Sequence, residues 1–138
     1  MYQIIILTGN LGSDPEMRYM ADGTAVTNFS MATNRKWTGS DGQLKEEVTW
    51  FRVSVWGRQA EACNQYLSKG RQVMVEGRLK PDPETGGPRI WAAQDGTSRA
   101  SFEVTANDVK VLSGGSSDGG QQAPAQGQAT KQKDDIPF

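Results

Sequence analysis

The sequence predicts an all-β domain of five strands, with one short helix between the third and fourth strands. Three observations lead to this prediction. Apolar and polar residues alternate over short stretches that Gly, Pro, Asn and Asp residues separate, which is typical of strands. Only residues 58–69 show the small and apolar spacing of a helix, and Gly70 follows them as a C-terminal stop. Long glycine-bearing loops separate strand two from strand three and strand four from strand five.

The first half of the chain supplies three of the five strands. Strand one, residues 2–8, is apolar on both faces, so the curvature of a barrel or another copy of the chain must cover its outer face. A turn at residues 9–12 and an irregular segment at 14–23 come next. Strand two covers about residues 25–35, and strand three covers residues 48–58.

The second half supplies the helix and the last two strands. Strand four covers residues 71–79 and strand five residues 101–112. Between them lies an irregular stretch, residues 80–99, which contains three prolines and the turn pair Asp95-Gly96. So long a loop in a compact domain tends to be functional, and Trp91 lies within it.

Strand three has two chemically different faces. Because strand side chains alternate, its odd positions form an ordinary core face: Phe51, Val53 and Val55. Its even positions place two indoles, two guanidiniums and a hydroxyl together: Trp50, Arg52, Ser54, Trp56 and Arg58. Such a face suits a nucleobase and its phosphate, although exposed Trp also packs under loops or at subunit contacts.

The order of three strands, a helix and two strands is that of an OB-fold, a five-stranded Greek-key barrel. OB-folds bind oligonucleotides or oligosaccharides with two loops and the sheet between them. Trp37 precedes the first of these loops, residues 38–42, and Trp91 lies in the second, while Trp50 and Trp56 lie on the sheet. All four tryptophans of the chain are therefore expected on the ligand-binding side.

Composition excludes several functional classes. The chain has no His and one Cys, Cys63, so it has no Cys/His metal set, no internal disulfide and no Ser/His or Cys/His catalysis. We expect neither an enzyme nor a bound cofactor. The longest strongly apolar run, Ile4 to Leu7, is far shorter than a membrane span, and the first residues do not resemble a signal peptide, so a cytoplasmic protein is expected.

Several motifs resemble the bacterial single-stranded DNA-binding protein family over about residues 2–112. They are Gly9-Asn10-Leu11-Gly12, Asp14-Pro15-Glu16, Arg18-Tyr19, Ala32-Thr33 with Trp37, Trp50-Phe51-Arg52-Val53 with Gly57, Tyr66-Leu67 with Lys69-Gly70, and Val75-Glu76-Gly77. The resemblance implies that Trp37, Trp50, Trp56 and Trp91 stack on bases. It also implies a homotetramer.

The chain departs from the family pattern at three places. The family often has Phe where this chain has Trp56, a change that keeps an aromatic face. Relatives often carry His at Phe51, which borders the subunit contact in the family. The proline-rich loop before Trp91 is partly acidic, with Asp82 and Glu84.

Net charge gives no basic signal, because the formal net charge is −1 and Lys plus Arg balance Asp plus Glu up to residue 112. Local placement matters more, because Arg52 and Arg58 are expected on the tryptophan face. Further cations are expected to line a path for phosphates: Arg18, Arg35, Lys36, Arg78 and Arg89. Each of these except Arg52 is equally compatible with an ordinary solvated charge.

The chain divides into a domain and a tail. Residues 113–133 have no large apolar side chain, which predicts a flexible linker. The end combines two carboxylates with an apolar tripeptide: Asp134, Asp135, Ile136, Pro137 and Phe138. Such a tip suits a partner with a hydrophobic pocket and a basic rim. In the resembled family this tip recruits proteins of replication, recombination and repair.

Together these features predict a non-enzymatic binder that coats single-stranded DNA on the nucleoid, with little sequence preference. The alternative is an OB-fold adaptor or oligosaccharide binder that uses the same tryptophan face. No residue visibly distinguishes DNA from RNA.

Overall fold

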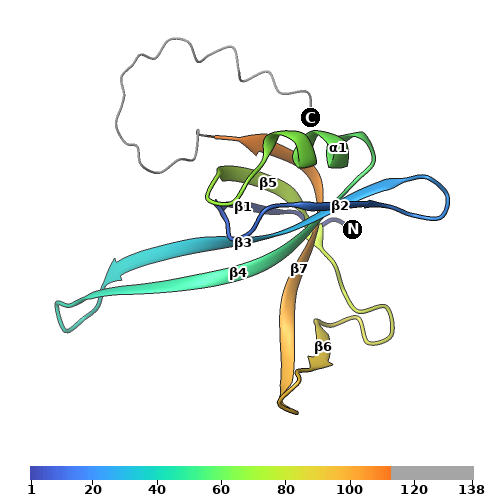
Figure 1. Ribbon diagram of the computed structural model, residues 1–138. Coiled ribbons are helices and arrows are strands. Elements are labelled where there is room, and N and C mark those ends of the chain that lie inside the picture. The colour runs from blue at the N-terminus through green and yellow to red at the C-terminus, as the bar shows by residue number, and fades with distance from the viewer. Residues whose placement is uncertain (113–138) are drawn as a thin grey trace, which may run out of the picture.

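The computed structural model describes residues 1–112, which form one β-barrel with long hairpins extending from it (Figure 1). The elements in chain order are β1 (Ile5–Leu11), β2 (Glu16–Tyr19), β3 (Ala25–Thr38), β4 (Leu44–Trp56), α1 (Arg58–Tyr66), β5 (Gln72–Leu79), β6 (Arg89–Ala92) and β7 (Ser98–Val111). Five of the strands form the barrel, and the short β2 and β6 belong to the hairpins. The predicted linker, residues 113–133, and the predicted tip, residues 134–138, lie outside the described residues.

The barrel closes because β1 pairs on both of its edges, with β5 on one and with β3 on the other. The strands are hydrogen-bonded in the order β1-β5-β7-β4-β3, and β1 meets β3 again through Asn10 and Leu11. All pairs are antiparallel except β4 with β7, which is parallel over only four residues of each strand, from Phe51 opposite Phe102 to Ser54 opposite Thr105. This five-stranded closed barrel with one helix confirms the predicted OB-fold.

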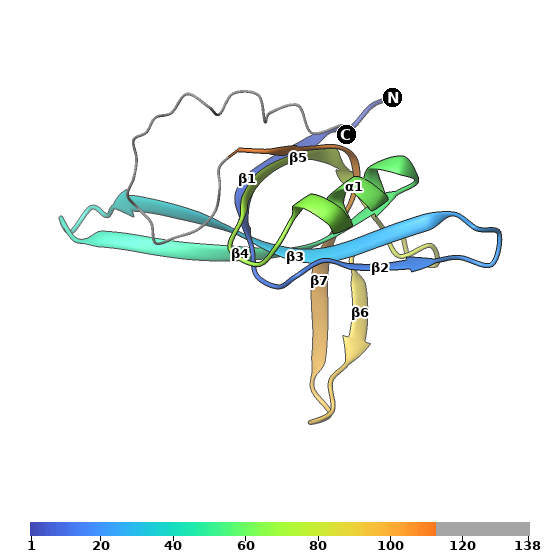
Figure 2. The ribbon, with the colours of Figure 1, turned by 45° about the horizontal axis from the view of Figure 1, so that its top comes forward.

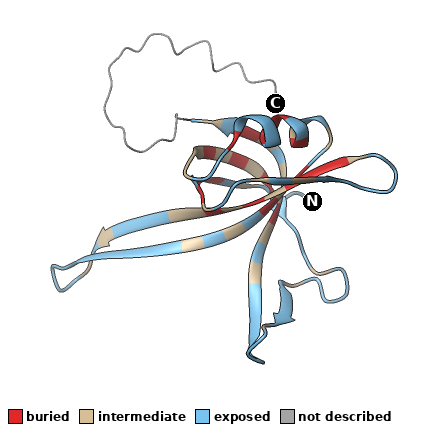
Figure 3. Cartoon of the chain, viewed as in Figure 1, coloured by how far each residue is buried: buried red, intermediate tan, exposed pale blue. Residues whose placement is uncertain are grey.

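The core is made of the inward-facing residues of the five barrel strands and one side of α1 (Figure 3). Val53 and Val55 are buried between the more exposed Arg52, Ser54 and Trp56, so the alternation predicted for this strand is confirmed. The helix is fastened to the barrel by the buried hydroxyl of Thr27, which donates to the Ala60 carbonyl at 2.6 Å. Burial raises the pKa of the Cys63 thiol to about 12, as expected for a small buried hydrophobe.

Figure 2 shows three hairpins, β2–β3, β3–β4 and β6–β7, and their turns have the same hydrogen bonds. In each, an Asp-Gly pair closes the turn with the glycine at positive φ: Gly23 at 91°, Gly42 at 81° and Gly96 at 87°. The glycine N–H donates to the carbonyl three residues earlier, and the residue after the glycine donates its N–H to the Asp side chain. Glycine adopts this conformation without strain, which explains why Asp-Gly pairs predict these turns.

Several predicted boundaries were wrong. Strand one runs from Ile5 to Leu11, so the predicted turn at 9–12 is largely strand. A Cβ on Gly9 would collide with the Ala32 carbonyl oxygen, so the glycine serves close strand packing there rather than a turn. The segment expected to be irregular contains β2, which pairs with β3. The helix ends at Tyr66, three residues earlier than expected.

The loop between strands four and five is only partly irregular. Residues 80–99 were expected to be irregular, but β6 pairs there with the first residues of β7. Strand three begins at Leu44, and β3 extends to Thr38. These extensions make two long hairpins, β3–β4 and β6–β7, which run in different directions from the barrel (Figure 1).

Within residues 1–112, the outer face of β1 is exposed. Ile6 is 58% exposed, and Ile4 just before the strand is also exposed. The curvature of the barrel therefore does not cover this face. Within residues 1–112, no helix has both the length and the apolar character that crossing a membrane requires.

Candidate nucleic-acid interface

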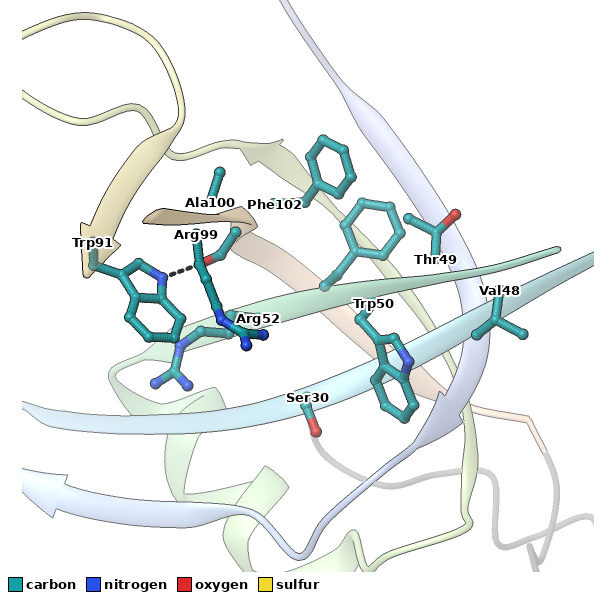
Figure 4. Close-up of a pocket in the computed structure, with 11 residues that line it drawn as sticks. Ser30, Val48, Thr49, Trp50, Arg52, Trp91, Arg99, Ala100 and Phe102 are labelled. Atoms are coloured by element: carbon teal, nitrogen blue, oxygen red, sulfur yellow. Dashed lines mark hydrogen bonds between the residues drawn. The ribbon is translucent and has the colours of Figure 1, made fainter. Parts of the chain in front are cut away.

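A hollow of about 490 Å³ lies where β4 and β7 diverge (Figure 4). The two strands pair only from Phe51 and Phe102 onward, so the residues before these two separate and leave a fork. We call this space the fork hollow. It is lined by Ser30 of β3, by Val48, Thr49, Trp50, Phe51 and Arg52 of β4, by Trp91 of β6, and by Arg99, Ala100, Ser101 and Phe102 of β7.

Two tryptophans, one from each hairpin, face the fork hollow. Trp50 is 54% exposed and Trp91 is 40% exposed, although both are large apolar side chains. Arg52 and Arg99 line the same hollow (Figure 4). The hollow therefore combines aromatic faces with guanidiniums, a combination that suits stacking on flat rings and contact with anions.

Trp50 is positioned by a glycine on the neighbouring turn. A Cβ on Gly12 would collide with Cζ3 of the Trp50 indole, so the ring lies directly against this glycine. The Gly12 N–H donates to the Ser30 carbonyl at 2.9 Å, which fixes that part of the backbone. The sequence does not reveal this contact, because it joins residues that are far apart in the chain.

Trp91 is held at its edge. Its Nε1–H donates to the Ser101 hydroxyl at 3.2 Å, drawn as a dashed line in Figure 4. Because the indole N–H lies in the ring plane, this hydrogen bond leaves the aromatic face free.

Trp37 is held differently and does not line the fork hollow. The Arg35 guanidinium lies 4.3 Å from the Trp37 ring centroid, and the same guanidinium forms a 3.1 Å ion pair with Glu47. In the β3–β4 register, Trp37 pairs with Lys45 and Trp50 with Ala32. The two indoles therefore start from opposite faces of this hairpin, which the sequence interpretation did not foresee.

The other predicted site residues lie outside the fork hollow. Trp56 is exposed on the same face of β4 as Trp50, at the far end of the strand. Lys36 is exposed near the end of β3, and Arg78 is exposed on β5. Arg89 lies on β6, where its guanidinium is 3.4 Å from the Glu103 carboxylate.

One placement was wrong. Arg58 does not continue the tryptophan face, because Gly57 at φ 76° ends the strand and Arg58 begins α1. The alternation of side chains ends with the strand, so an even number no longer indicates the same face. Arg99, by contrast, lines the hollow and was missed. Arg99 lies two residues before Ser101, so alternation places both side chains on the same face of β7. The predicted strand began only at residue 101, which left Arg99 in the loop.

Within residues 1–112, the cations of the fork hollow differ in what they contact. Arg52 forms no ion pair there, whereas Arg99 lies 3.8 Å from the Asp95 carboxylate at the tip of its own hairpin. The Asp95 pKa is lowered, mainly by hydrogen bonds from the side chain and backbone of Thr97. No group of three potential metal-ligating His, Cys, Asp or Glu side chains occurs in the described part of the chain.

The similarity of this chain to known proteins covers the barrel domain. Residues 2–112 match the family described as the single-strand binding protein family. Single-stranded DNA-binding proteins of two Neisseria meningitidis strains, serogroups A and B, are each 40% identical over 110 residues. Those residues are 80% of this chain but 59% of the relatives' length, so the match covers little more than half of each relative.

Solved structures agree with this match. An SSB of Plasmodium falciparum in complex with ssDNA aligns with a TM-score of 0.67 and 27% identity, over 82% of this chain and 97% of that one. A deletion mutant of the single-stranded DNA binding protein from Thermus aquaticus aligns with a TM-score of 0.62 and 32% identity, over 80% and 50%. A small single-stranded DNA-binding protein from Streptomyces coelicolor shares the fold, with a TM-score of 0.66 and 23% identity, over 80% and 94%.

Proposed function

The chain belongs to the single-strand binding protein family, and from this membership we propose that it binds single-stranded DNA with little sequence preference. The observation that carries the proposal is the fork hollow, where Trp50 and Trp91 present aromatic faces and Arg52 and Arg99 line the same space. Every base has a flat face, so stacking on these indoles does not depend on sequence. A base inside a duplex has both faces covered, so the same site disfavours double strands.

Stacking accounts for affinity without a net positive charge. In proteins of this class, each stacked base contributes roughly 1–3 kcal/mol. Arg52 and Arg99 add phosphate contacts at the point where the bases stack. The proposed path also includes Lys36 on the Trp50 face of the β3–β4 hairpin, Trp37 and Arg35 on its other face, and Trp56 on the barrel.

Arg58, Arg78 and Arg89 are weaker candidates for phosphate contact. Arg58 lies in α1, and the Arg89 charge is partly neutralised by Glu103. For each of them, an ordinary surface charge explains the position equally well.

We propose that the protein assembles as a homotetramer through the outer face of β1. Ile4 and Ile6 are exposed there, and uncovered apolar side chains of this size favour burial against a partner. In the described residues, β1 pairs with β5 along its length but with β3 only at Asn10 and Leu11. Residues 5–9 therefore leave one strand edge open to pair with a second copy.

We propose that residues 134–138 recruit proteins of replication, recombination and repair to the coated strand, and that the protein acts without catalysis on the nucleoid in the cytoplasm. The support is the sequence of the tip, Asp134, Asp135, Ile136, Pro137 and Phe138, in which carboxylates precede an apolar end. Deleting these five residues should leave DNA binding unchanged and abolish recovery of the partners. Unchanged recovery would refute this role.

The main proposal is tested by titrating the full chain with oligo-dT and following the intrinsic tryptophan fluorescence. Stacking should quench the emission strongly at low oligonucleotide concentration. Duplex DNA of the same length and an oligosaccharide serve as the competing ligands and should have much weaker effects. Equal quenching by duplex would exclude a single-strand binder, and stronger quenching by the oligosaccharide would favour the alternative of a sugar-binding module.

A further inference from the structure

Two residues of the proposed interface, Arg89 and Trp91, lie on the very short strand β6. It has four residues, all of them exposed, and it pairs only with the first residues of β7. A two-stranded hairpin of this length is marginally stable by itself. Something beyond the backbone ladder must therefore fix Trp91 and Arg89 if they are to meet a ligand in a defined geometry.

The first fixing contact involves Ser101. In the register of the hairpin, Trp91 is opposite Arg99, yet its Nε1–H reaches Ser101, two residues closer to the barrel, at 3.2 Å. The indole therefore leans along β7 toward the barrel end of the strand. Its edge is occupied by the hydrogen bond and its face is turned to the fork hollow (Figure 4).

The second fixing contact involves Glu103 and has the same offset along β7 as the first. Arg89 is opposite Ser101, and its guanidinium reaches Glu103, again two residues closer to the barrel, at 3.4 Å. The Glu103 side chain is only 11% exposed, and its backbone carbonyl accepts from the Lys80 N–H at 2.8 Å. Glu103 therefore belongs to the rigid end of β7, where the strand also pairs with Arg52 of β4.

A nearly buried carboxylate on this face needs an explanation. Glu103 shares its side of the sheet with Arg52 and Ser101, and a negative charge there repels a polyanion. The charge is compatible with binding if it holds a cation in place.

We propose that Ser101 and Glu103 are positioning residues, which fix Trp91 and Arg89 so that the indole is presented to the strand before the strand arrives. This proposal rests on the proposed function for its effect on DNA, but the fixing itself exists in the free protein. Holding a side chain in its bound geometry reduces the entropy that binding must otherwise cost. Ser101 acts through Trp91, and Glu103 acts through Arg89.

The test uses Ser101→Ala in the full chain, with Ser101→Thr as the variant that keeps the hydroxyl and Ser98→Ala as the matched control on the same strand. In the free protein, the Trp91 indole N–H resonance, assigned with Trp91→Phe, should exchange faster with water in Ser101→Ala. Affinity for labelled oligo-dT, measured by anisotropy, should fall about two- to tenfold, the range of a lost neutral hydrogen bond. Both properties should return in Ser101→Thr and stay at the wild-type level in Ser98→Ala.

Glu103→Gln gives an independent test, because positioning and simple charge predict opposite signs. Removing a negative charge from the face strengthens DNA binding if Glu103 only repels phosphate. If Glu103 positions Arg89, the same change should weaken binding about two- to fivefold.

The outcomes separate the two proposals. Unchanged indole exchange in Ser101→Ala, or tighter binding by Glu103→Gln, overturns the positioning role. A wild-type chain that does not bind oligo-dT overturns the proposed function alone, since the indole exchange is measured without DNA.

Discussion

The two long hairpins are built alike and use their tryptophans differently. Both close with an Asp-Gly turn, in which the Asp also pairs with a cation four residues later: Asp41 with Lys45 and Asp95 with Arg99. On β6–β7 the Trp91 edge is bound, and the side chain is 40% exposed and lines the fork hollow. On β3–β4 the Trp37 face is covered by Arg35. The contrast teaches that an indole on a hairpin is an available stacking surface only when its face, and not just its position, is free.

Replacing Trp91 and Trp37 by alanine, one at a time, should show the difference between the two hairpins most clearly. We expect Trp91→Ala to weaken binding of oligo-dT by about 1–3 kcal/mol, the range known for this class of proteins. Trp37→Ala should cost less than about 1 kcal/mol, because Arg35 must be displaced before a base occupies the covered face. Anisotropy of a labelled oligonucleotide measures both, and thermal unfolding should show little change because both side chains are partly exposed.

A third variant checks that the covering arginine is the cause. With Arg35→Gln the Trp37 face is uncovered, so acrylamide should quench its emission more efficiently in the free protein. A Trp37→Ala loss equal to that of Trp91→Ala would show that the cover has no effect on stacking.

The sequence was a good guide wherever local chemistry decides the structure. The turn pair Asp95-Gly96 and the glycine-bearing loop at residues 38–42 both lie at hairpin turns, and alternation along β4 separated Val53 and Val55 from Trp50 and Arg52. These predictions succeeded because turn geometry and side-chain alternation depend on near neighbours.

The sequence was a poor guide wherever distant segments meet. The short, exposed β6 was missed because its four residues carry a weaker strand signal than the loop signal of the prolines before them. These residues form a strand because they pair with β7. The contact of Gly12 with Trp50 and the covering of Trp37 by Arg35 depend on register and rotamer, which no local pattern encodes. Arg58 was misplaced because one glycine at positive φ ended the alternation.

The contact of Gly12 with Trp50 provides the next largest expected effect. Gly12 is not among the described glycines at positive φ, so Gly12→Ala is acceptable to the backbone, but its Cβ would push the indole aside. Moving Trp50 from its preferred position should weaken binding by about 0.5–1.5 kcal/mol, the usual cost of a distorted rotamer. No atom that faces the ligand is removed, so the change isolates orientation from chemistry.

A double-mutant cycle is the control for this effect. In a Trp50→Ala background the Gly12→Ala change should alter oligo-dT affinity very little, because the displaced ring is gone. If Gly12→Ala weakens binding equally in both backgrounds, the glycine acts through the backbone and not through the indole.

The smallest effect concerns the charge at the tip of β6–β7, where Thr97 makes a side-chain hydrogen bond to Asp95 that Gln43 does not make to Asp41 in the β3–β4 turn. Thr97 donates its side chain to Asp95 at 2.7 Å, in addition to its backbone N–H, and these bonds lower the Asp95 pKa below its ordinary value of 3.8. The ionised carboxylate therefore stabilises the folded turn above pH 3.8, and this contribution is lost as the pH falls through the lowered pKa. Asp95→Asn keeps the oxygen that accepts these hydrogen bonds and removes the charge.

The stability advantage of the wild type over Asp95→Asn should accordingly be constant above about pH 5, which is more than one unit above the ordinary pKa, and should shrink below pH 3.8. Thermal unfolding at a series of pH values measures the difference, and a carboxyl NMR titration locates the Asp95 pKa directly. Binding of oligo-dT should change little, because the turn is exposed and its ion pair with Arg99 is a surface one. An advantage that stays the same through pH 3 would mean that the hydrogen bonds, and not the charge they stabilise, distinguish this turn from the one at Asp41.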